Sequence, residues 1–262
     1  MSERPRCEQR PQRRRLAAVA DPGCGYVEIS EIAEDLATQA VGQGHGLSGP
    51  MDTEHYASHL AALWESARPV LGPEKASALG CEVVERLGAS GDPVAAVILR
   101  GLAAVGERPP GALAARLASR PAPEGVELPG WIDSVGEAIA VGAGRVEDPT
   151  SDDGTIVMMD LRWPSGDGAG VGVFIDANGY AKHILVGPSI EECVDEIEDH
   201  ERQRWPLETL DRRHAADLMA AAVEVTEASP DARVGETYGS QRAFLRCQLR
   251  RLTAVPRDRR AA

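Results

Sequence analysis

The chain has 262 residues, a formal net charge of −13, 43% hydrophobic residues and 26% charged residues. This length leaves room for one large domain or two smaller ones with an apolar core, and the composition is that of a globular protein. No hydrophobic run approaches the roughly 20 residues that a membrane-spanning helix needs, so we expect no membrane contact.

Cysteine and arginine usage indicate the compartment and the genome. The five cysteines are odd in number, scattered and without a CxxC pair, which argues against a disulfide framework or a zinc ribbon. We therefore expect reduced thiols in a cytoplasm. Among 28 basic residues only Lys75 and Lys182 are lysines, and this arginine bias, with abundant Ala and Gly, is typical of a bacterial protein from a GC-rich genome.

The first half of the chain is predicted to be helical. Residues 1–25 are rich in Arg and Pro without periodicity, and we expect them to form a disordered tail. Residues 26–120 contain alanine-rich helical runs separated by Gly and Pro, which is typical of a small helix bundle. The segment 121–130, which reads PAPEGVELPG, is predicted to be a linker.

Residues 131–253 are predicted to form an α+β domain with a small antiparallel sheet of three to four strands. The clearest strand covers 156–163, where apolar residues alternate with Asp160 and Arg162. The apolar face of this strand holds Val157, Met159, Leu161 and Trp163. The segment WPLETL at 205–210 is a candidate for one more short strand.

A hairpin is predicted where Asn178-Gly179 separates two strand-like runs. Asn-Gly favours a two-residue hairpin turn, because both residues tolerate positive φ. With these two residues at the centre of the turn, the expected cross-strand neighbours are Phe174 with His183, Val173 with Ile184, and Ile175 with Lys182.

Three helices are expected to follow the sheet and to pack on one of its faces. The first begins after Ser189, where Glu192 completes a capping box. Its predicted buried stripe consists of Ile190, Cys193, Val194 and Ile197. The second covers 211–228 and the third about 238–252, and residues 254–262 are expected to be a disordered basic tail.

Charge is distributed unevenly along the chain. Residues 129–200 carry fifteen acidic side chains against three basic ones, a net charge of −12, whereas residues 1–20 carry +4 and residues 201–262 carry +3. An acidic centre with basic ends fits two arrangements, in which the basic ends fold back on the acidic core or contact an acidic partner such as nucleic acid. The first is favoured, since nucleic-acid-binding domains are usually basic overall.

The last helix carries the one candidate interaction site. Arg242, Arg246 and Arg250 recur at four-residue spacing and therefore lie in line on one helix face. Guanidinium groups in line can grip phosphates bidentately, or they can pair with the acidic face of 191–199 within the same chain. The internal or simply solvated arrangement is the favoured interpretation.

No other pattern predicts a site. His55 and His59 are spaced as two ligands on one helix, but the Glu of HExxH and an obvious third ligand are missing, so a solvated helix side is the better interpretation. The acidic residues of the sheet region match no calcium loop; they are Asp148, Asp152, Asp153, Asp160, Asp167 and Asp176. The sequence predicts no catalytic, cofactor-binding or metal-binding residue.

Three functional hypotheses follow, and the motifs of no known family support any of them. The first is a non-enzymatic accessory or regulatory factor of the cytoplasm that binds another protein. The second is a nucleic-acid-associated protein that uses its arginine-rich terminal segments. The third is a hydrolase whose acidic sheet region holds a metal ion.

Overall fold

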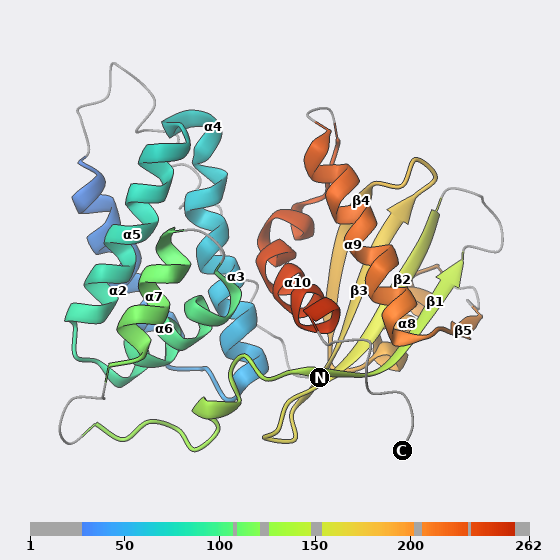
Figure 1. Ribbon diagram of the computed structural model, residues 1–262, viewed down its shortest axis with the longest axis horizontal. Helices are drawn as coiled ribbons and strands as arrows, with labels where there is room; N and C mark the ends of the chain where they lie inside the picture. Colours follow the sequence, from blue (N-terminus) through green and yellow to red (C-terminus); the bar gives the residue numbers. More distant parts are fainter. Residues whose placement is uncertain are drawn as a thin grey trace.

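The computed structural model describes residues 28–106, 109–120, 126–147, 154–201, 206–229 and 232–254, without the side chains of 196–201 and 253–254. Helices come first, and a single antiparallel sheet with packed helices follows, so the predicted α+β class is confirmed (Figure 1). The predicted tails at 1–25 and 254–262 lie outside the described residues, apart from Ala254, as does half of the predicted linker at 121–130. No helix within the described ranges is long and apolar enough to cross a membrane.

The described part of the helical region contains six helices, four of which begin at a proline. They are α2 (Ile29–Gly44), α3 (Pro50–Ser66), α4 (Arg68–Leu71), α5 (Pro73–Ala89), α6 (Pro93–Val105) and α7 (Pro109–Ala118). Proline suits the first helical position because its missing N–H is not needed in the first turn. The prolines that separate the alanine-rich runs in the sequence are therefore the first residues of these helices.

A close crossing between α3 and α6 sets the centre of this region. Gly101 of α6 approaches α3 so closely that a Cβ atom there would lie 2.7 Å from the carbonyl oxygen of Thr53 and 2.9 Å from Cβ of Ala57. Around this crossing the core is made of small and aliphatic side chains with Trp64. Small residues thus allow the two helix backbones to approach each other.

The described part of the second half contains five strands, and the fifth lies within the candidate short strand at 205–210. They are β1 (Ile139–Glu147), β2 (Gly154–Arg162), β3 (Gly168–Asp176), β4 (Ala181–Gly187) and β5 (Leu207–Thr209). The sheet order is β4-β3-β2-β1-β5, and neighbouring strands are antiparallel. Three more helices and one turn of 3-10 helix complete the fold; they are η1 (Ile132–Ser134), α8 (Ile190–Glu201), α9 (Arg212–Ala228) and α10 (Glu236–Ala254).

Helices cover both faces of the sheet, so the prediction that they pack on one face is wrong. The face of β2 that holds Val157 and Met159 packs against α9 and α10, as expected. On the other face, Ile156 and Met158 pack against Ile190, Cys193 and Val194 of α8. A strand buried on both faces needs a second helical layer, and α8 supplies it.

The predicted hairpin forms between β3 and β4, but with a longer turn. Phe174 faces His183 and Val173 faces Ile184, as predicted, whereas Ile175 pairs with Ala181 and not with Lys182. Asp176 causes the difference, because its Oδ1 accepts hydrogen bonds from the backbone N–H groups of Asn178 (3.0 Å) and Tyr180 (2.9 Å). The loop therefore has three residues and ends with Gly179 at φ +81°.

Helix α10 joins the two halves of the molecule. It packs against α3 and α6 on one side and against β4 and α9 on the other (Figure 1). Its apolar side contributes Tyr238, Phe244, Leu245 and Leu249 to the core that it shares with the sheet. Every polar contact between α3 and α10 therefore also fixes the helical region against the sheet.

Candidate interaction site between α3 and α10

The most deeply buried charge in the contact between α3 and α10 is Glu54, whose side chain is 0% exposed. Its Oε1 accepts hydrogen bonds from Nε1 of Trp163 (2.7 Å) and the backbone N–H of Gly136 (2.8 Å). Its Oε2 accepts from Nε2 of Gln248 (2.7 Å) and pairs with Arg251 (3.2 Å). A buried carboxylate with four donors, one of which is a guanidinium, is satisfied, so Glu54 holds the surrounding segments together.

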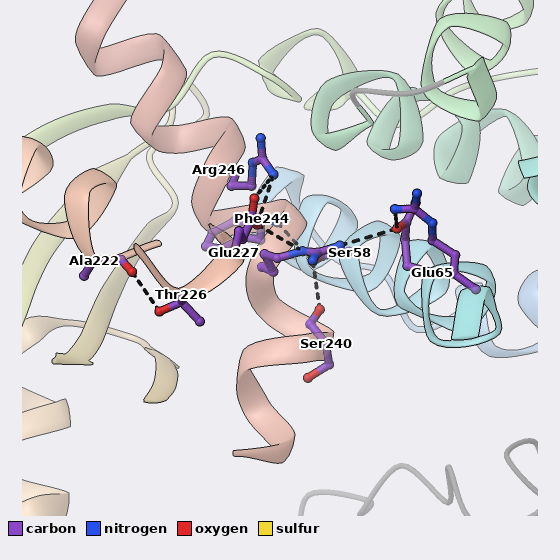
Figure 2. Close-up of polar contacts among 10 residues, drawn as sticks. Ser58, Glu65, Ala222, Thr226, Glu227, Ser240, Phe244 and Arg246 are labelled. Carbon is purple, nitrogen blue, oxygen red and sulfur yellow. Dashed lines mark hydrogen bonds and ion pairs between the residues drawn. The ribbon is translucent and has the colours of Figure 1, made fainter. Parts of the chain in front are cut away.

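One turn further along α3, the hydroxyl of Ser58 bridges two backbone groups of α10. Its Oγ accepts a hydrogen bond from the N–H of Phe244 (3.0 Å) and donates one to the carbonyl oxygen of Ser240 (2.8 Å) (Figure 2). Phe244 and Ser240 are four residues apart, the spacing at which these two groups bond each other in an ideal helix. Ser58 thus holds α10 through its backbone.

Two histidines of α3 meet Gln241 of α10 beside this contact. The ring centroids of His55 and His59 lie 4.7 Å apart in a T-shaped arrangement, and Nε2 of Gln241 is 2.8 Å from Nε2 of His59. Burial, reinforced by the neighbouring His59, lowers the pKa of His55 to about 4, although Asp52 and Gln241 oppose the shift. Burial also lowers the pKa of His59. Both imidazoles are therefore neutral at neutral pH, and they lie half-buried against α10 and not on a fully solvated helix side as the sequence predicts.

An alternating chain of charges runs across the surface next to these residues. Arg68 lies 3.2 Å from Glu65, Glu65 lies 3.5 Å from Arg242, Arg242 lies 3.7 Å from Glu227, and Glu227 lies 2.7 Å from Arg246. These five residues come from α4, α3, α10 and α9, and we call them the ion-pair chain. The part around Glu65, Glu227 and Arg246 is seen in Figure 2.

Two grooves flank the ion pair between Glu65 and Arg242. The larger, which we call the polar groove, has a volume of about 170 Å³ and lies between α3 and α10; besides the ion pair its walls include His59, Ala62, Leu63, Ser66 and Ser240. The smaller, which we call the apolar groove, has a volume of about 60 Å³; its walls include Ala61, Trp64, Leu102, Val105, Pro110 and Arg246. Glu65 and Arg242 line both.

The three predicted interaction residues do not stay together. Arg242 and Arg246 lie in the ion-pair chain at the grooves, whereas Arg250 is exposed further along α10 and lines neither groove. Arg242 and Arg246 pair within the chain, as expected, and among the described side chains their partners are Glu65 and Glu227. The start of α8 packs on the opposite face of the sheet, and the side chains of 196–199 lie outside the described residues.

The acidic residues of the sheet region have local roles where they are described. Asp160 accepts a hydrogen bond from the N–H of Ile190 (2.8 Å) at the start of α8, and Asp176 pairs with Lys182 (3.1 Å). Asp167 accepts a hydrogen bond from the hydroxyl of Ser165 (2.8 Å). The predicted candidates Asp148, Asp152 and Asp153 lie outside the described residues. Among the residues that are described, no three His, Cys, Asp or Glu side chains are grouped to hold a metal ion.

Sequence patterns missed most of this site. Glu54 and Ser58 lie on the same helical face as Ala57 and Ala61, and a polar residue within a stripe of small residues is a readable sign of a buried polar contact. Their partners, however, are up to 197 residues away in the chain. The periodicity of apolar residues along the sequence cannot identify such a distant partner.

Comparison of the chain with protein-family models, with curated proteins and with solved structures gave no match. The geometry between α3 and α10 therefore carries the functional assignment.

Proposed function

We propose that the chain is a non-enzymatic accessory or regulatory factor that docks a segment of another protein across α3 and α10. The observation that carries this proposal is the position of Arg242. Its side chain is 30% exposed, and it lies between two surface grooves where the helical region meets the sheet domain. Partly exposed arginines next to apolar walls are frequent anchors in protein interfaces.

The sizes of the grooves support a partner protein over a cofactor or a small metabolite. Sites for such ligands have volumes of roughly 300–1,000 Å³ and enclose most of the ligand. Volumes of about 170 Å³ and 60 Å³ are suited to individual side chains of a docked segment. A segment that lies across both grooves would use them as two neighbouring side-chain pockets.

The charges next to the arginines favour protein over nucleic acid. A phosphate backbone that approached Arg242 or Arg246 would also meet the carboxylates of Glu65 and Glu227, which lie within 3.7 Å of the guanidinium groups. Nucleic-acid sites, in contrast, concentrate basic side chains without such neighbours. Nucleic acid remains the second candidate partner, through the arginine-rich terminal segments 1–20 and 255–262.

The proposed place of action is the cytoplasm of a bacterium. The described cysteines, Cys81, Cys193 and Cys247, form no disulfide. Reduced thiols, two of them buried, are compatible with a reducing compartment. The arginine-rich, lysine-poor composition adds support for a GC-rich bacterial source.

A steric block of the polar groove tests the proposal. Ser66 is exposed at the groove, and its hydroxyl donates to the carbonyl oxygen of Leu63; Ser119 makes the same contact with Arg116 at the end of α7. We expect Ser66→Trp to abolish, and Ser119→Trp to retain, the stoichiometric co-purification of a protein from native cells. Equal recovery with both variants, or recovery of nucleic acid alone, would refute docking at this groove.

A further inference from the structure

The contact between α3 and α10 has two ends that differ in how their buried polar atoms are paired. At one, which we call the Glu54 end, both carboxylate oxygens of Glu54 accept hydrogen bonds, and Gln248 uses both its Nε2 and its Oε1. At the other, which we call the His59 end, Nε2 of His55 and Oε1 of Gln241 are buried without a hydrogen-bond partner among the described residues. A buried polar atom without a partner costs free energy, so the His59 end is the weaker one.

The two grooves described above also lie towards the His59 end. His59 itself lines the polar groove, whereas neither Glu54 nor Gln248 lines either groove. Van der Waals attraction needs atoms in contact, and a groove leaves the side chains along it without neighbours on one side. Less packing is therefore lost when the two helices separate at the His59 end than when they separate at the Glu54 end.

Ser58, which lies between the two ends, opposes such a separation only weakly. Its hydroxyl bridges the N–H of Phe244 and the carbonyl oxygen of Ser240. These two backbone groups can bond each other along α10 once the hydroxyl withdraws. Separation at the His59 end therefore leaves neither of them unpaired.

Two imidazoles in contact make the His59 end sensitive to acid. The ring centroids of His55 and His59 lie 4.7 Å apart, and burial in the closed contact lowers the pKa of both. The charged side chains that face the pair come from α3, with Asp52 and Glu65, and from α10, with Arg242. A proton taken up in the closed contact would place a positive charge beside a second imidazole and an arginine, away from water. Protonation is therefore easier once water reaches the rings.

We propose that proton uptake by His55 and His59 opens the contact between α3 and α10 at the His59 end, while the Glu54 end stays closed and acts as the hinge. In the open form water reaches both imidazoles, and a solvated imidazole binds a proton near about pH 6.5. Acid therefore favours the open form, and the closed form prevails at neutral pH. The opening is a property of the chain alone, so it stands or falls independently of the partner proposed above.

Hydrogen exchange measured by NMR on the natural chain tests this opening, because each end has a glutamine carboxamide that reaches from α10 to α3. Nε2 of Gln241 lies 2.8 Å from Nε2 of His59, and Nε2 of Gln248 donates to Glu54 (2.7 Å). Both groups are primary amides, so the ratio of their exchange rates reports the difference in protection. From about pH 7.5 to about pH 5, the protection of Gln241 should fall about tenfold or more and that of Gln248 less than about twofold.

Two variants separate the histidine pair from the other titrating groups. The acid-induced fall in the protection of Gln241 should shrink in His55→Gln and persist in His214→Gln, since His214 is exposed on α9. An undiminished fall in His55→Gln would overturn the role of the pair. Equal falls for Gln241 and Gln248 in the natural chain would overturn the hinge, and protection of Gln241 that is independent of pH would overturn the opening. The comparison of the two glutamines needs no variant, so it decides the proposal where His55→Gln does not fold.

Discussion

The carboxylate of Glu54 accepts a hydrogen bond from the indole Nε1 of Trp163 at 2.7 Å, although the two residues are 109 positions apart. Glu54 belongs to α3, and Trp163 directly follows β2. The same carboxylate also pairs with Arg251 of α10. One buried charge therefore ties the helical region, the sheet and the last helix together, and the surface on which the grooves lie depends on this tie.

Removal of the Glu54 side chain should strongly destabilise the protein. In Glu54→Ala the donors of Trp163, Gln248 and Arg251 lose their shared acceptor within the interior. Loss of one partner from a buried ion pair costs about 3–5 kcal/mol of unfolding free energy, which urea titration followed by tryptophan fluorescence can measure. The exposed Glu85 of α5 is the control, and Glu85→Ala should change stability by less than about 0.5 kcal/mol. Equal effects would contradict the role of Glu54.

Ser58→Ala should have a small effect on stability and a local effect on α10. The N–H of Phe244 and the carbonyl oxygen of Ser240 lose the bridging hydroxyl, but they can then bond each other along the helix. We expect a loss of about 1 kcal/mol and altered hydrogen exchange at Phe244. Ser66→Ala removes a hydroxyl from the exposed side of α3 and should leave this amide unchanged. An unaltered Phe244 amide in Ser58→Ala would argue against the bridge.

Acid should destabilise the fold through His55. Its pKa is lowered from 6.5 to about 4 in the folded state, so between these values the unfolded chain binds a proton that the folded chain does not. The stability that neutral His55 contributes is fully present above pH 6.5. It is lost as the pH falls, and the loss is complete below about pH 4. The total for this residue is about 3 kcal/mol.

The difference between the natural chain and His55→Gln isolates this effect from the titration of carboxylates. Unfolding free energy measured between about pH 4 and pH 7 should depend less on pH in His55→Gln. His214 is exposed near the start of α9, and His214→Gln should retain the pH dependence of the natural chain. Equal slopes in all three proteins would show that His55 is not buried between α3 and α10.

Two glycine substitutions should have effects of opposite sign. Gly101→Ala places a methyl group 2.7 Å from the carbonyl oxygen of Thr53 and forces α3 and α6 apart, at a cost of about 1–3 kcal/mol. Gly42 lies in α2, and a Cβ atom there would meet no other atom within 4 Å, so Gly42→Ala should stabilise the protein by about 0.5–1 kcal/mol. Thermal unfolding measures both, and destabilisation by both would refute the assigned packing.

The local spacing of apolar and capping residues made much of the fold predictable from the sequence. The alternation of Val157 and Met159 indicated the correct inner face of β2, and Ser189 caps α8 through the N–H of Glu192 as predicted. The short strand β5 lies within the candidate segment at 205–210. The turn at Asp176 was beyond such patterns, because it is set by a side chain that competes with the Asn-Gly signal.

The site was less predictable than the fold, because its contacts join distant segments. The spacing of Arg242 and Arg246 correctly indicated an arginine face, but their partners on α3 and α9 follow only from the packing of α10. Glutamate is seldom fully buried, so residue type alone offers little reason to place Glu54 in the interior. Its four donors come from three separate segments of the chain.

Site-specific cross-linking in native cells tests the central claim, docking across α3 and α10, most directly. A photoreactive phenylalanine analogue placed at Ser66, in the polar groove, should capture one protein, and the same analogue at Ser119, just after α7, should not. Capture at Ser66 should decrease in Arg242→Gln. Equal labelling from Ser66 and Ser119, or no captured protein from Ser66, would contradict the assignment of this surface.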